Sequence, residues 1–259
     1  MKVEVISPHG FCAGVARALK IANAALSEGL PLYCLHEIVH NESVVKDLAE
    51  RGMRFVDDVD DVPPGSVVLV SAHGASPAAI AAASGRGMRI IDATCPFVAA
   101  GHLKIRENFA QGMRTVVIGT PGHAEVRGYL GEPGACLPAD VKPGEETGRI
   151  VQTTLDSGEY EGVCSATRDR QQAVRSFVES RLGSCPGGVG VLVVGSAKSA
   201  NTARLAEIAR QSGGKSWRVS SLEEAEGLDF DGTGVLGVTS GASTPESLFL
   251  PIVAYLRGR

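Results

Sequence analysis

The sequence lacks long apolar runs and blocks of basic residues, and aromatic side chains make up only 5% of it. No apolar run approaches the roughly 18 residues of a membrane-spanning helix, so no span is expected. Because Lys and Arg are scattered and the formal net charge is −4, a nucleic-acid groove is not expected either. Residues 1–7 are too few and too polar for the apolar part of a signal peptide. These absences predict a cytoplasmic protein that binds neither membranes nor nucleic acids.

No two cysteines are separated by two residues. That C-x-x-C spacing is the signature of zinc ribbons and of thioredoxin-like redox sites, so neither kind of site is indicated. Thiols stay reduced in the cytoplasm, so the six cysteines are not expected to form a disulfide framework. Cys12 and Cys95 interrupt turns that contain Gly or Pro, and Cys164 lies in a similar turn. A metal site with three thiolates is one interpretation of these residues, and burial as small apolar side chains is the other. The remaining cysteines fit burial: Cys34, Cys136 and Cys185.

Glycine is abundant, at 32 positions, and one structural unit recurs along the chain. In each unit a short β-branched run ends in small or polar residues, and an Ala-rich helical pattern often follows. Strands that alternate with helices indicate parallel sheets with crossover helices. We therefore predict an α/β protein built from small parallel-sheet domains. The expected strands are 3–7, 67–70, 89–91, 115–118, 189–194 and 234–238, with helices at 15–26 and 202–211 and loops at 130–147 and 183–190.

Histidines occupy several of the turns that follow these strands, where ligands bind in parallel-sheet proteins. A single turn histidine is usually solvated or held by a local hydrogen bond. His40, His73 and His123 at the ends of successive strands instead suit an anionic ligand, because imidazole donates hydrogen bonds to phosphate oxygens. Glu125 lies two residues after His123, and it becomes a candidate acid if burial raises its pKa.

Ser199, Asn201 and Ser243 stand where such residues commonly cap helices. The same hydroxyl groups, together with free backbone N–H groups at a helix N-terminus, also form anion sites. Two such turns and several histidines would suit a diphosphate without magnesium. The arginine-rich segment 167–182 is expected to be a solvated helix face.

Taken together, these turns resemble the 4-hydroxy-3-methylbut-2-enyl diphosphate reductase (LytB) family. Nine motifs stand in family order between residues 10 and 243. They are GFCAGV (10–15), EIVHN (37–41), SAHG with SP (71–77), DATCP (92–96), GH with EV (122–126), QTTL (152–155), C with AT and RQ (164–171), GS with S and N (195–201) and GAS (241–243).

The resemblance implies three pseudo-symmetric α/β lobes around a central iron–sulfur cluster. The lobes would span 14–95, 96–162, and 163–259 together with 1–13. Each lobe would contribute one cysteine to a 4Fe-4S cluster whose fourth iron stays open. The cysteines that match the ligand positions are Cys12, Cys95 and Cys164.

The resemblance also assigns the substrate site and the reaction. Glu125 matches the acid that delivers a proton, assisted by His123 and Thr153. The reaction would remove the hydroxyl group of the allylic diphosphate and give isopentenyl and dimethylallyl diphosphates, with electrons from ferredoxin or flavodoxin. The positions expected to bind substrate are His40, His73, His123, Ser199, Asn201 and Ser243.

This sequence departs from the family pattern in places. Ala200 replaces a usual second serine of the phosphate turn, and the middle lobe is short. A divergent paralogue that reduces a related allylic or phosphorylated substrate is therefore one alternative, and a cluster-bearing redox sensor or anion-binding protein without turnover is another. Glu125 and Thr153 favour an enzyme, because a sensor needs thiolates but no proton donor.

Overall fold

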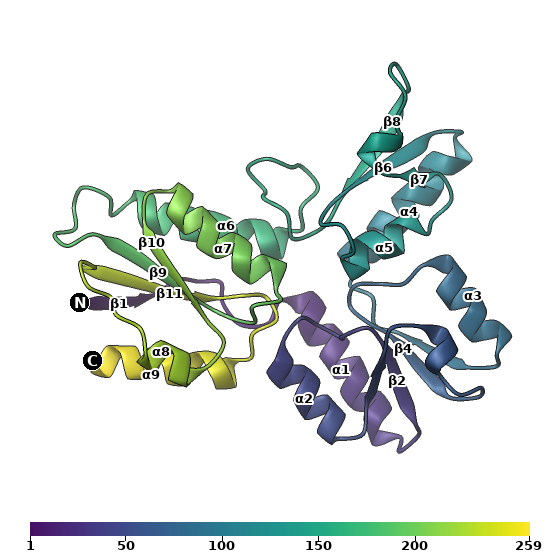
Figure 1. Cartoon of the computed structure of the whole chain (residues 1–259), viewed down its shortest axis with the longest axis horizontal. Helices are drawn as coiled ribbons and strands as arrows, with labels where there is room; N and C mark the ends of the chain where they lie inside the picture. Colours follow the sequence, from purple (N-terminus) through teal and green to yellow (C-terminus); the bar gives the residue numbers. More distant parts are fainter. The chain divides into compact units, whose positions relative to one another are not determined.

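The computed structural model describes all residues 1–259, and its strands form three separate sheets (Figure 1). Every strand pair in these sheets is parallel, and helices connect most successive strands. The predicted α/β class with small parallel sheets is therefore confirmed.

The sheet β1-β11-β9-β10 combines the first strand of the chain with the last three. Its central strands β9 and β11 are buried along their whole length, and helices cover both faces. Val174 of α6 and Leu205 of α7 pack on one face, and Phe249 of α9 packs on the other. The elements are β1 (Lys2–Val5), α6 (Ser165–Glu179), β9 (Val189–Val194), α7 (Ala200–Gln211), β10 (Lys215–Val219), α8 (Leu222–Glu226), β11 (Val235–Ser240) and α9 (Glu246–Gly258).

The sheet β3-β2-β4-β5 has the fully buried strands β2 and β4 at its centre. Pro77 begins α3, with Ser76 as N-cap: its hydroxyl accepts the backbone N–H of Ala79. The elements are α1 (Ala13–Ser27), β2 (Leu32–Leu35), α2 (Glu42–Glu50), β3 (Arg54–Val56), a 3-10 turn (Val59–Asp61), β4 (Val67–Val70), α3 (Pro77–Gly85) and β5 (Arg89–Asp92).

The third sheet, β7-β6-β8, is the smallest. Its apolar core joins Val117 of the central strand to Ile105 of α4 and Val126 of α5. The elements are α4 (Pro96–Ala110), β6 (Arg114–Ile118), α5 (Ala124–Leu130), β7 (Ala135–Cys136), a 3-10 turn (Pro138–Asp140) and β8 (Thr147–Val151).

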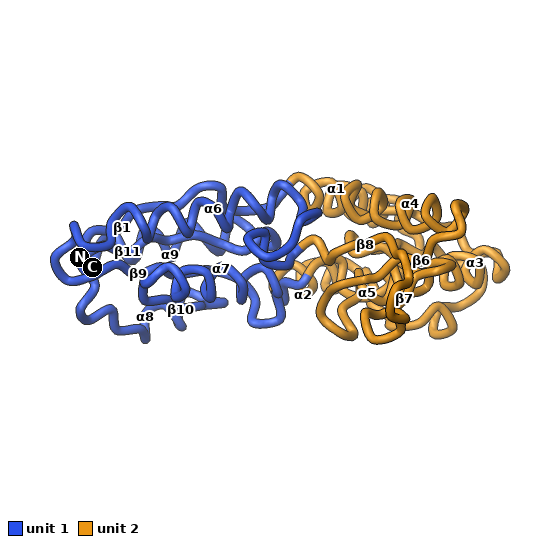
Figure 2. The backbone as a smooth tube through the Cα atoms, turned by 90° about the horizontal axis from the view of Figure 1, so that it is seen from above, with its two compact units in different colours: residues 1–12, 40–42, 154–259 blue, residues 13–39, 43–153 orange.

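The chain divides into two compact units, which Figure 2 shows in different colours. Unit 1 comprises 1–12, 40–42 and 154–259, and it contains the sheet β1-β11-β9-β10. Unit 2 comprises 13–39 and 43–153, and it contains the other two sheets. Each of the three lobes predicted from the sequence holds one sheet, and the lobe boundaries themselves stay a prediction.

The expected loop at 130–147 was wrong in part, because it contains β7 and a 3-10 turn. Strand β7 has only two residues, too few for an alternating pattern to register. The expected loop at 183–190 ends two residues too late, since β9 begins at Val189. Strand β10 was not expected, because its Lys, Ser and Arg are polar and only its last residue is buried.

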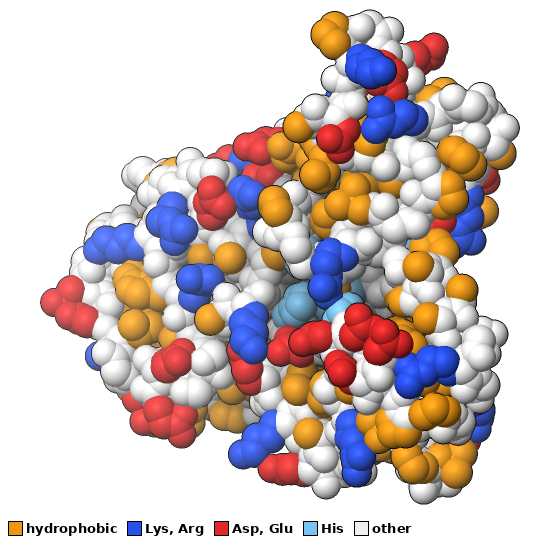
Figure 3. Space-filling view, turned by 45° about the vertical axis from the view of Figure 1, so that its right-hand side comes forward, with side chains coloured by type: hydrophobic (Ala, Val, Ile, Leu, Met, Phe, Trp, Pro, Cys, Tyr) orange, Lys and Arg blue, Asp and Glu red, His pale blue; other side chains and the backbone are white.

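No helix of the structure is both long enough and apolar enough to cross a membrane. Acidic and basic side chains are interspersed over the face shown in Figure 3, without a broad basic patch. This agrees with the scattered Lys and Arg of the sequence.

Candidate functional site

The three cysteines singled out from the sequence each directly precede a helix. Cys12 stands before α1, Cys95 is the N-cap of α4, and Cys164 is the N-cap of α6. All three are half-buried. Because a helix N-terminus favours negative charge, each position suits a thiolate. Cys12 and Cys164 belong to unit 1, and Cys95 belongs to unit 2.

Of the three cysteines expected to be buried, Cys34 and Cys136 are, and Cys185 is half-buried. Cys34 is buried in β2, and this burial raises the pKa of its thiol. Cys136 is buried in β7, where its Sγ lies 3.6 Å from the carbonyl oxygen of Thr115, and burial raises the pKa of this thiol as well. Cys185 packs against the core between the sheet of unit 1 and α6. The buried thiols of Cys34 and Cys136 are therefore poor candidates for metal ligands.

Arg170 of α6 faces the two cysteines of unit 1. Burial lowers the pKa of its guanidinium, and attraction to Cys12 and Cys164 acts in the opposite direction. Its side chain donates to the carbonyl oxygens of Gly10 (2.8 Å) and Ala166 (2.9 Å). The expected solvated face of 167–182 was wrong here, because Arg170 is only 3% exposed.

A second arginine holds the turn before Cys95. Arg17 of α1 donates to the carbonyl oxygen of Thr94 at 2.9 Å, within unit 2. In both units an arginine thus binds a backbone carbonyl one or two residues before a cysteine. The sequence gives no spacing that signals either contact, since Arg170 and Gly10 are 160 residues apart.

Glu125 is a buried carboxyl group in the first turn of α5, with 1% of its surface exposed. Its Oε1 accepts the backbone N–H of Thr153 at 2.7 Å, and its Oε2 lies 2.9 Å from the hydroxyl oxygen of that residue. Burial raises the pKa of Glu125 to about 7, although hydrogen bonds from Thr153 and Tyr129 oppose the rise. A carboxyl group with this pKa can act as a general acid at neutral pH.

Gly119 allows this arrangement. It follows β6, and a Cβ atom at this position would lie 2.4 Å from Val126 and 2.9 Å from the side chain of Gln152. Gln152 in turn accepts the backbone N–H of Thr120 through its Oε1 at 2.8 Å. Only glycine therefore lets the turn after β6 pack closely on Gln152, the residue that precedes Thr153.

His73 and His123 lie together in unit 2. Their ring centroids are 5.4 Å apart, with the rings nearly perpendicular. His123 is the N-cap of α5, and its Nδ1 accepts the backbone N–H of Glu125 at 3.2 Å. Because Nδ1 is an acceptor, the proton of the neutral ring lies on Nε2, which can then donate to an anion.

The remaining predicted binding residues lie in unit 1. Ser243 donates to the carbonyl oxygen of His40 at 3.1 Å. Ser199 is the N-cap of α7 and accepts the backbone N–H of Thr202. Of the three residues expected at cap positions, only Ser199 caps a helix, because Asn201 lies inside α7 and Pro245 caps α9.

The side chain of Asn201 is 4% exposed, and neither its Oδ1 nor its Nδ2 has a hydrogen-bond partner. Buried amide groups in folded proteins are almost always paired. An orphaned amide of this kind indicates a site for a polar ligand.

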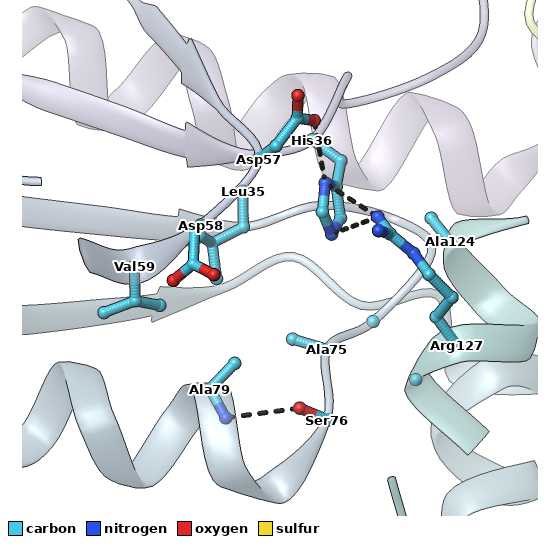
Figure 4. A pocket seen from close by; sticks show the side chains of 12 residues that line it. Leu35, His36, Asp57, Asp58, Val59, Ala75, Ser76, Ala79, Ala124 and Arg127 are labelled. Atoms are coloured by element: carbon cyan, nitrogen blue, oxygen red, sulfur yellow. Dashed lines mark hydrogen bonds and ion pairs between the residues drawn. The ribbon is translucent and has the colours of Figure 1, made fainter. Parts of the chain in front are cut away.

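A pocket of about 230 Å³ lies elsewhere in unit 2 (Figure 4). Leu35 and Val59 form part of its apolar wall. At its edge Nη2 of Arg127 lies 3.0 Å from Nε2 of His36, and Oδ1 of Asp57 lies 3.4 Å from Nδ1 of the same ring. None of the residues predicted for catalysis, cluster or substrate lines this pocket.

A family model described as LytB protein matches residues 3–257. The chain belongs to the LytB family. Members of this family depend on an iron–sulfur centre. The resemblance found in the sequence is therefore confirmed.

Curated relatives named 4-hydroxy-3-methylbut-2-enyl diphosphate reductase align with nearly the whole chain. The protein from Burkholderia pseudomallei is 37% identical over 292 residues, covering 99% of this chain and 90% of the relative. The protein from Neisseria gonorrhoeae is 38% identical over 287 residues, covering 99% and 87%. The solved structure of E-1-hydroxy-2-methyl-but-2-enyl-4-diphosphate reductase from Plasmodium falciparum matches with a TM-score of 0.88 and 27% identity, covering 98% of this chain and 87% of that one.

Proposed function

We propose that the chain reduces 4-hydroxy-3-methylbut-2-enyl diphosphate to isopentenyl and dimethylallyl diphosphates. The observation that carries the proposal is the buried carboxyl group of Glu125, with its pKa raised to about 7, held by Thr153 beside His123 in a LytB-family chain. The relatives from Burkholderia pseudomallei and Neisseria gonorrhoeae bear the name of this activity.

The reaction breaks the C–O bond of the allylic alcohol. The oxygen leaves as water, and a C–H bond forms at one of the two ends of the allylic system. Two electrons and two protons balance the step. The protein must therefore supply a proton donor, an electron source and a site for the diphosphate group.

Cys12, Cys95 and Cys164 are the proposed ligands of a 4Fe-4S cluster. Their half-buried thiols at helix N-termini fit thiolate ligation, and Arg170 places a positive charge beside Cys12 and Cys164. When bound, the cluster supplies electrons and Lewis acidity at the substrate's hydroxyl group.

Glu125 is the proposed proton donor for the leaving oxygen. Thr153 holds both carboxyl oxygens, so the acid keeps one orientation. Burial keeps the group partly protonated near neutral pH and limits exchange of its proton with bulk water. His123 supports the same turn through the backbone N–H of Glu125.

The diphosphate is proposed to bind neutral donors rather than a metal ion. In unit 1 these are the hydroxyl groups of Ser199 and Ser243, the amide of Asn201 and the imidazole of His40. In unit 2 His73 and His123 offer ring N–H groups. Neutral donors fit a dianionic or trianionic group because each hydrogen bond to an anion is charge-assisted.

A turnover assay tests the proposal. Anaerobically reconstituted protein is supplied with dithionite-reduced viologen and with the hydroxylated diphosphate, and the five-carbon products are identified. We expect both diphosphate products, and a Glu125→Gln variant slower by about two orders of magnitude. Substrate binding without turnover would overturn the proposal in favour of a redox sensor, and turnover of only a related allylic substrate would indicate a divergent reductase.

The physiological electron donor is proposed to be ferredoxin or flavodoxin, and the location is proposed to be cytoplasmic. Each protein is tested as the only electron source in the same assay. A donor that sustains turnover without viologen supports the assignment, and failure of both contradicts it.

A further inference from the structure

Tyr129 is not among the residues proposed for catalysis or substrate binding, yet its hydroxyl group contacts the carboxyl group of Glu125. It lies one helical turn after Glu125 on α5, is 1% exposed, and hydrogen-bonds to the Glu125 side chain. Residues four apart lie on the same face of a helix, so the contact is built into α5 itself. The carboxyl group thus has two hydrogen-bond partners, Thr153 in the turn after β8 and Tyr129.

Space for this hydroxyl group depends on Gly101 of α4. A Cβ atom at residue 101 would lie 2.4 Å from Oη of Tyr129 and 2.7 Å from its Cζ. The phenol therefore packs directly against the backbone of α4. A tyrosine fixed so closely on one neighbouring helix has little freedom to turn away from Glu125.

A polar cluster formed by the buried His102 and Glu132 and by the exposed Arg106 supports the other side of the ring. The ring of His102 packs edge-on against Tyr129, with centroids 4.9 Å apart. Nδ1 of His102 donates to Glu132 at 2.7 Å, and Arg106 donates to both oxygens of the same carboxylate at 2.8 and 2.9 Å. Burial raises the pKa of Glu132, but the bonds from Arg106 and His102 outweigh it and hold the pKa below its ordinary value.

We propose that Tyr129 is a positioning residue that sets the orientation and acidity of Glu125, and that the His102–Arg106–Glu132 cluster fixes Tyr129 in place. The inference rests on the proposed function, because it assumes that Glu125 delivers the proton. Tyr129 acts through the acid that it touches, so its loss should change catalysis more than substrate affinity.

The groups around Glu125 are mostly neutral hydrogen-bond formers. Thr153 and Tyr129 contact the carboxyl group directly. Among titratable groups, His123 lies in the same turn with His73 packed on its ring, and His102 lies behind Tyr129 on α4. Cys95 packs against the apolar cluster that includes Tyr129. The acidity of Glu125 therefore depends on burial and on a few neutral hydrogen bonds, of which Tyr129 supplies one.

The direction of the effect follows from the chemistry of that bond. A hydroxyl group that donates to a carboxylate stabilises its ionised form and lowers its pKa. Tyr129→Phe removes the hydroxyl group and keeps the ring, so the pKa of Glu125 should rise by roughly one unit. Because the protonated acid is the active form, activity should persist to higher pH in the variant, while a less well oriented acid lowers the maximal rate by about tenfold.

The test compares Tyr129→Phe with Tyr33→Phe in reconstituted holoenzyme. Tyr33 is a matched control, because it is buried in unit 2 and its hydroxyl accepts from Arg54 at 2.9 Å, away from Glu125. We expect Tyr129→Phe to lower kcat about tenfold, to leave KM within roughly twofold, and to move the basic limb of the pH profile upward by about one unit. Tyr33→Phe should leave the basic limb in place. An unchanged kcat and pH profile in Tyr129→Phe would overturn the inference.

A second readout does not need turnover. The carbonyl band of the protonated carboxyl group, assigned by its loss in Glu125→Gln, is followed by infrared titration in wild type and in Tyr129→Phe. An upward shift in the variant supports the inference, and identical titrations reject it. Absence of turnover in wild type counts against the proposed function alone. If Tyr129→Phe does not fold, Glu132→Gln, which loosens the cluster, should move the titration in the same direction, and no movement rejects the role of the cluster.

Discussion

The guanidinium group of Arg170 donates a hydrogen bond of 2.8 Å to the carbonyl oxygen of Gly10. This bond joins α6 to the turn that carries Cys12, and the same side chain faces the thiol groups of Cys12 and Cys164. Two cysteines that are far apart in the sequence thereby share one buried cation. The contact both orients the turn and balances negative charge at the proposed ligands.

Replacement of Arg170 should weaken the retention of iron. In Arg170→Gln the thiolates lose their neighbouring positive charge, and the turn at Gly10 loses its anchor, so we expect iron to be lost about tenfold faster on exposure to air. Iron and sulfide per chain, followed over time, measure the effect. Arg168→Gln is the matched control, because this arginine lies on the same helix with its side chain 62% exposed. Equal rates in the two variants would contradict the assignment.

Substitutions should divide the cysteines into those that hold iron and those that only pack. Cys12→Ser, Cys95→Ser and Cys164→Ser are expected to lose most of their iron and the brown colour of the cluster, because serine is a poor ligand for iron–sulfur centres. Cys34→Ala and Cys136→Ala should keep their iron and lose only stability, since both thiols are buried in strands. Normal iron content in Cys95→Ser would remove that residue from the ligand set.

Glu125→Gln should make the protein more stable above neutral pH. The pKa of Glu125 is raised to about 7 in the fold, against an ordinary value of 4.5. Between these values the unfolded chain is ionised and the folded chain is not, so wild-type stability falls as the pH rises toward 7 and stays reduced above it. The amide cannot ionise, and we expect its free energy of unfolding at pH 8 to exceed that of wild type by about 3 kcal/mol.

Urea unfolding at pH 4.5 and pH 8 measures this difference. At pH 4.5 the two proteins should differ little, because the carboxyl group is protonated in the folded state. A difference that does not grow with pH would show that burial does not control the acidity of Glu125.

Asn201→Leu should increase the stability of the fold and weaken substrate binding. The amide of Asn201 is buried without a partner, so leucine should raise the free energy of unfolding by about 1 kcal/mol while substrate binding weakens roughly tenfold. Asn108→Leu is the control, because this buried asparagine donates to the hydroxyl group of Thr115 at 2.9 Å. It should lose stability and retain substrate affinity. Calorimetric titration with the diphosphate and urea unfolding measure the two effects, and loss of stability in Asn201→Leu would contradict the prediction.

The buried central strands were predictable from the sequence, and several edge elements were not. Val189–Val194 and Val67–Val70 are continuous β-branched runs, typical of parallel strands covered on both faces. Strand β10 pairs only with β9 and carries polar residues, so its position depends on backbone pairing with that neighbour rather than on its own pattern.

The residues of the candidate site likewise divide into those that the sequence marks and those whose role depends on distant contacts. The turns that hold the three cysteines are local features, and their Gly and Pro residues mark them in the sequence. The burial of Arg170 depends on a distant contact with Gly10. The charged residues of α6 therefore predicted a solvated side chain where the structure has a buried one. The contact between Tyr129 and Glu125 has the spacing of a helical turn and could have been found, whereas the orphaned amide of Asn201 could not.

The pairing of β1 with β11 also governs when this protein can mature. Residues 2–5 have no sheet to join until residues 235–238 have been synthesised, and the backbone N–H of Cys12 waits for the carbonyl oxygen of Ala242. At ordinary rates of translation the ribosome needs on the order of ten seconds or more to extend the chain that far. Throughout that interval the turn that carries Cys12 lacks its native partners in β11 and at Ala242. If Cys12 is a cluster ligand as proposed, its turn is complete, and able to receive iron and sulfide, only after residues 235–242 have been synthesised.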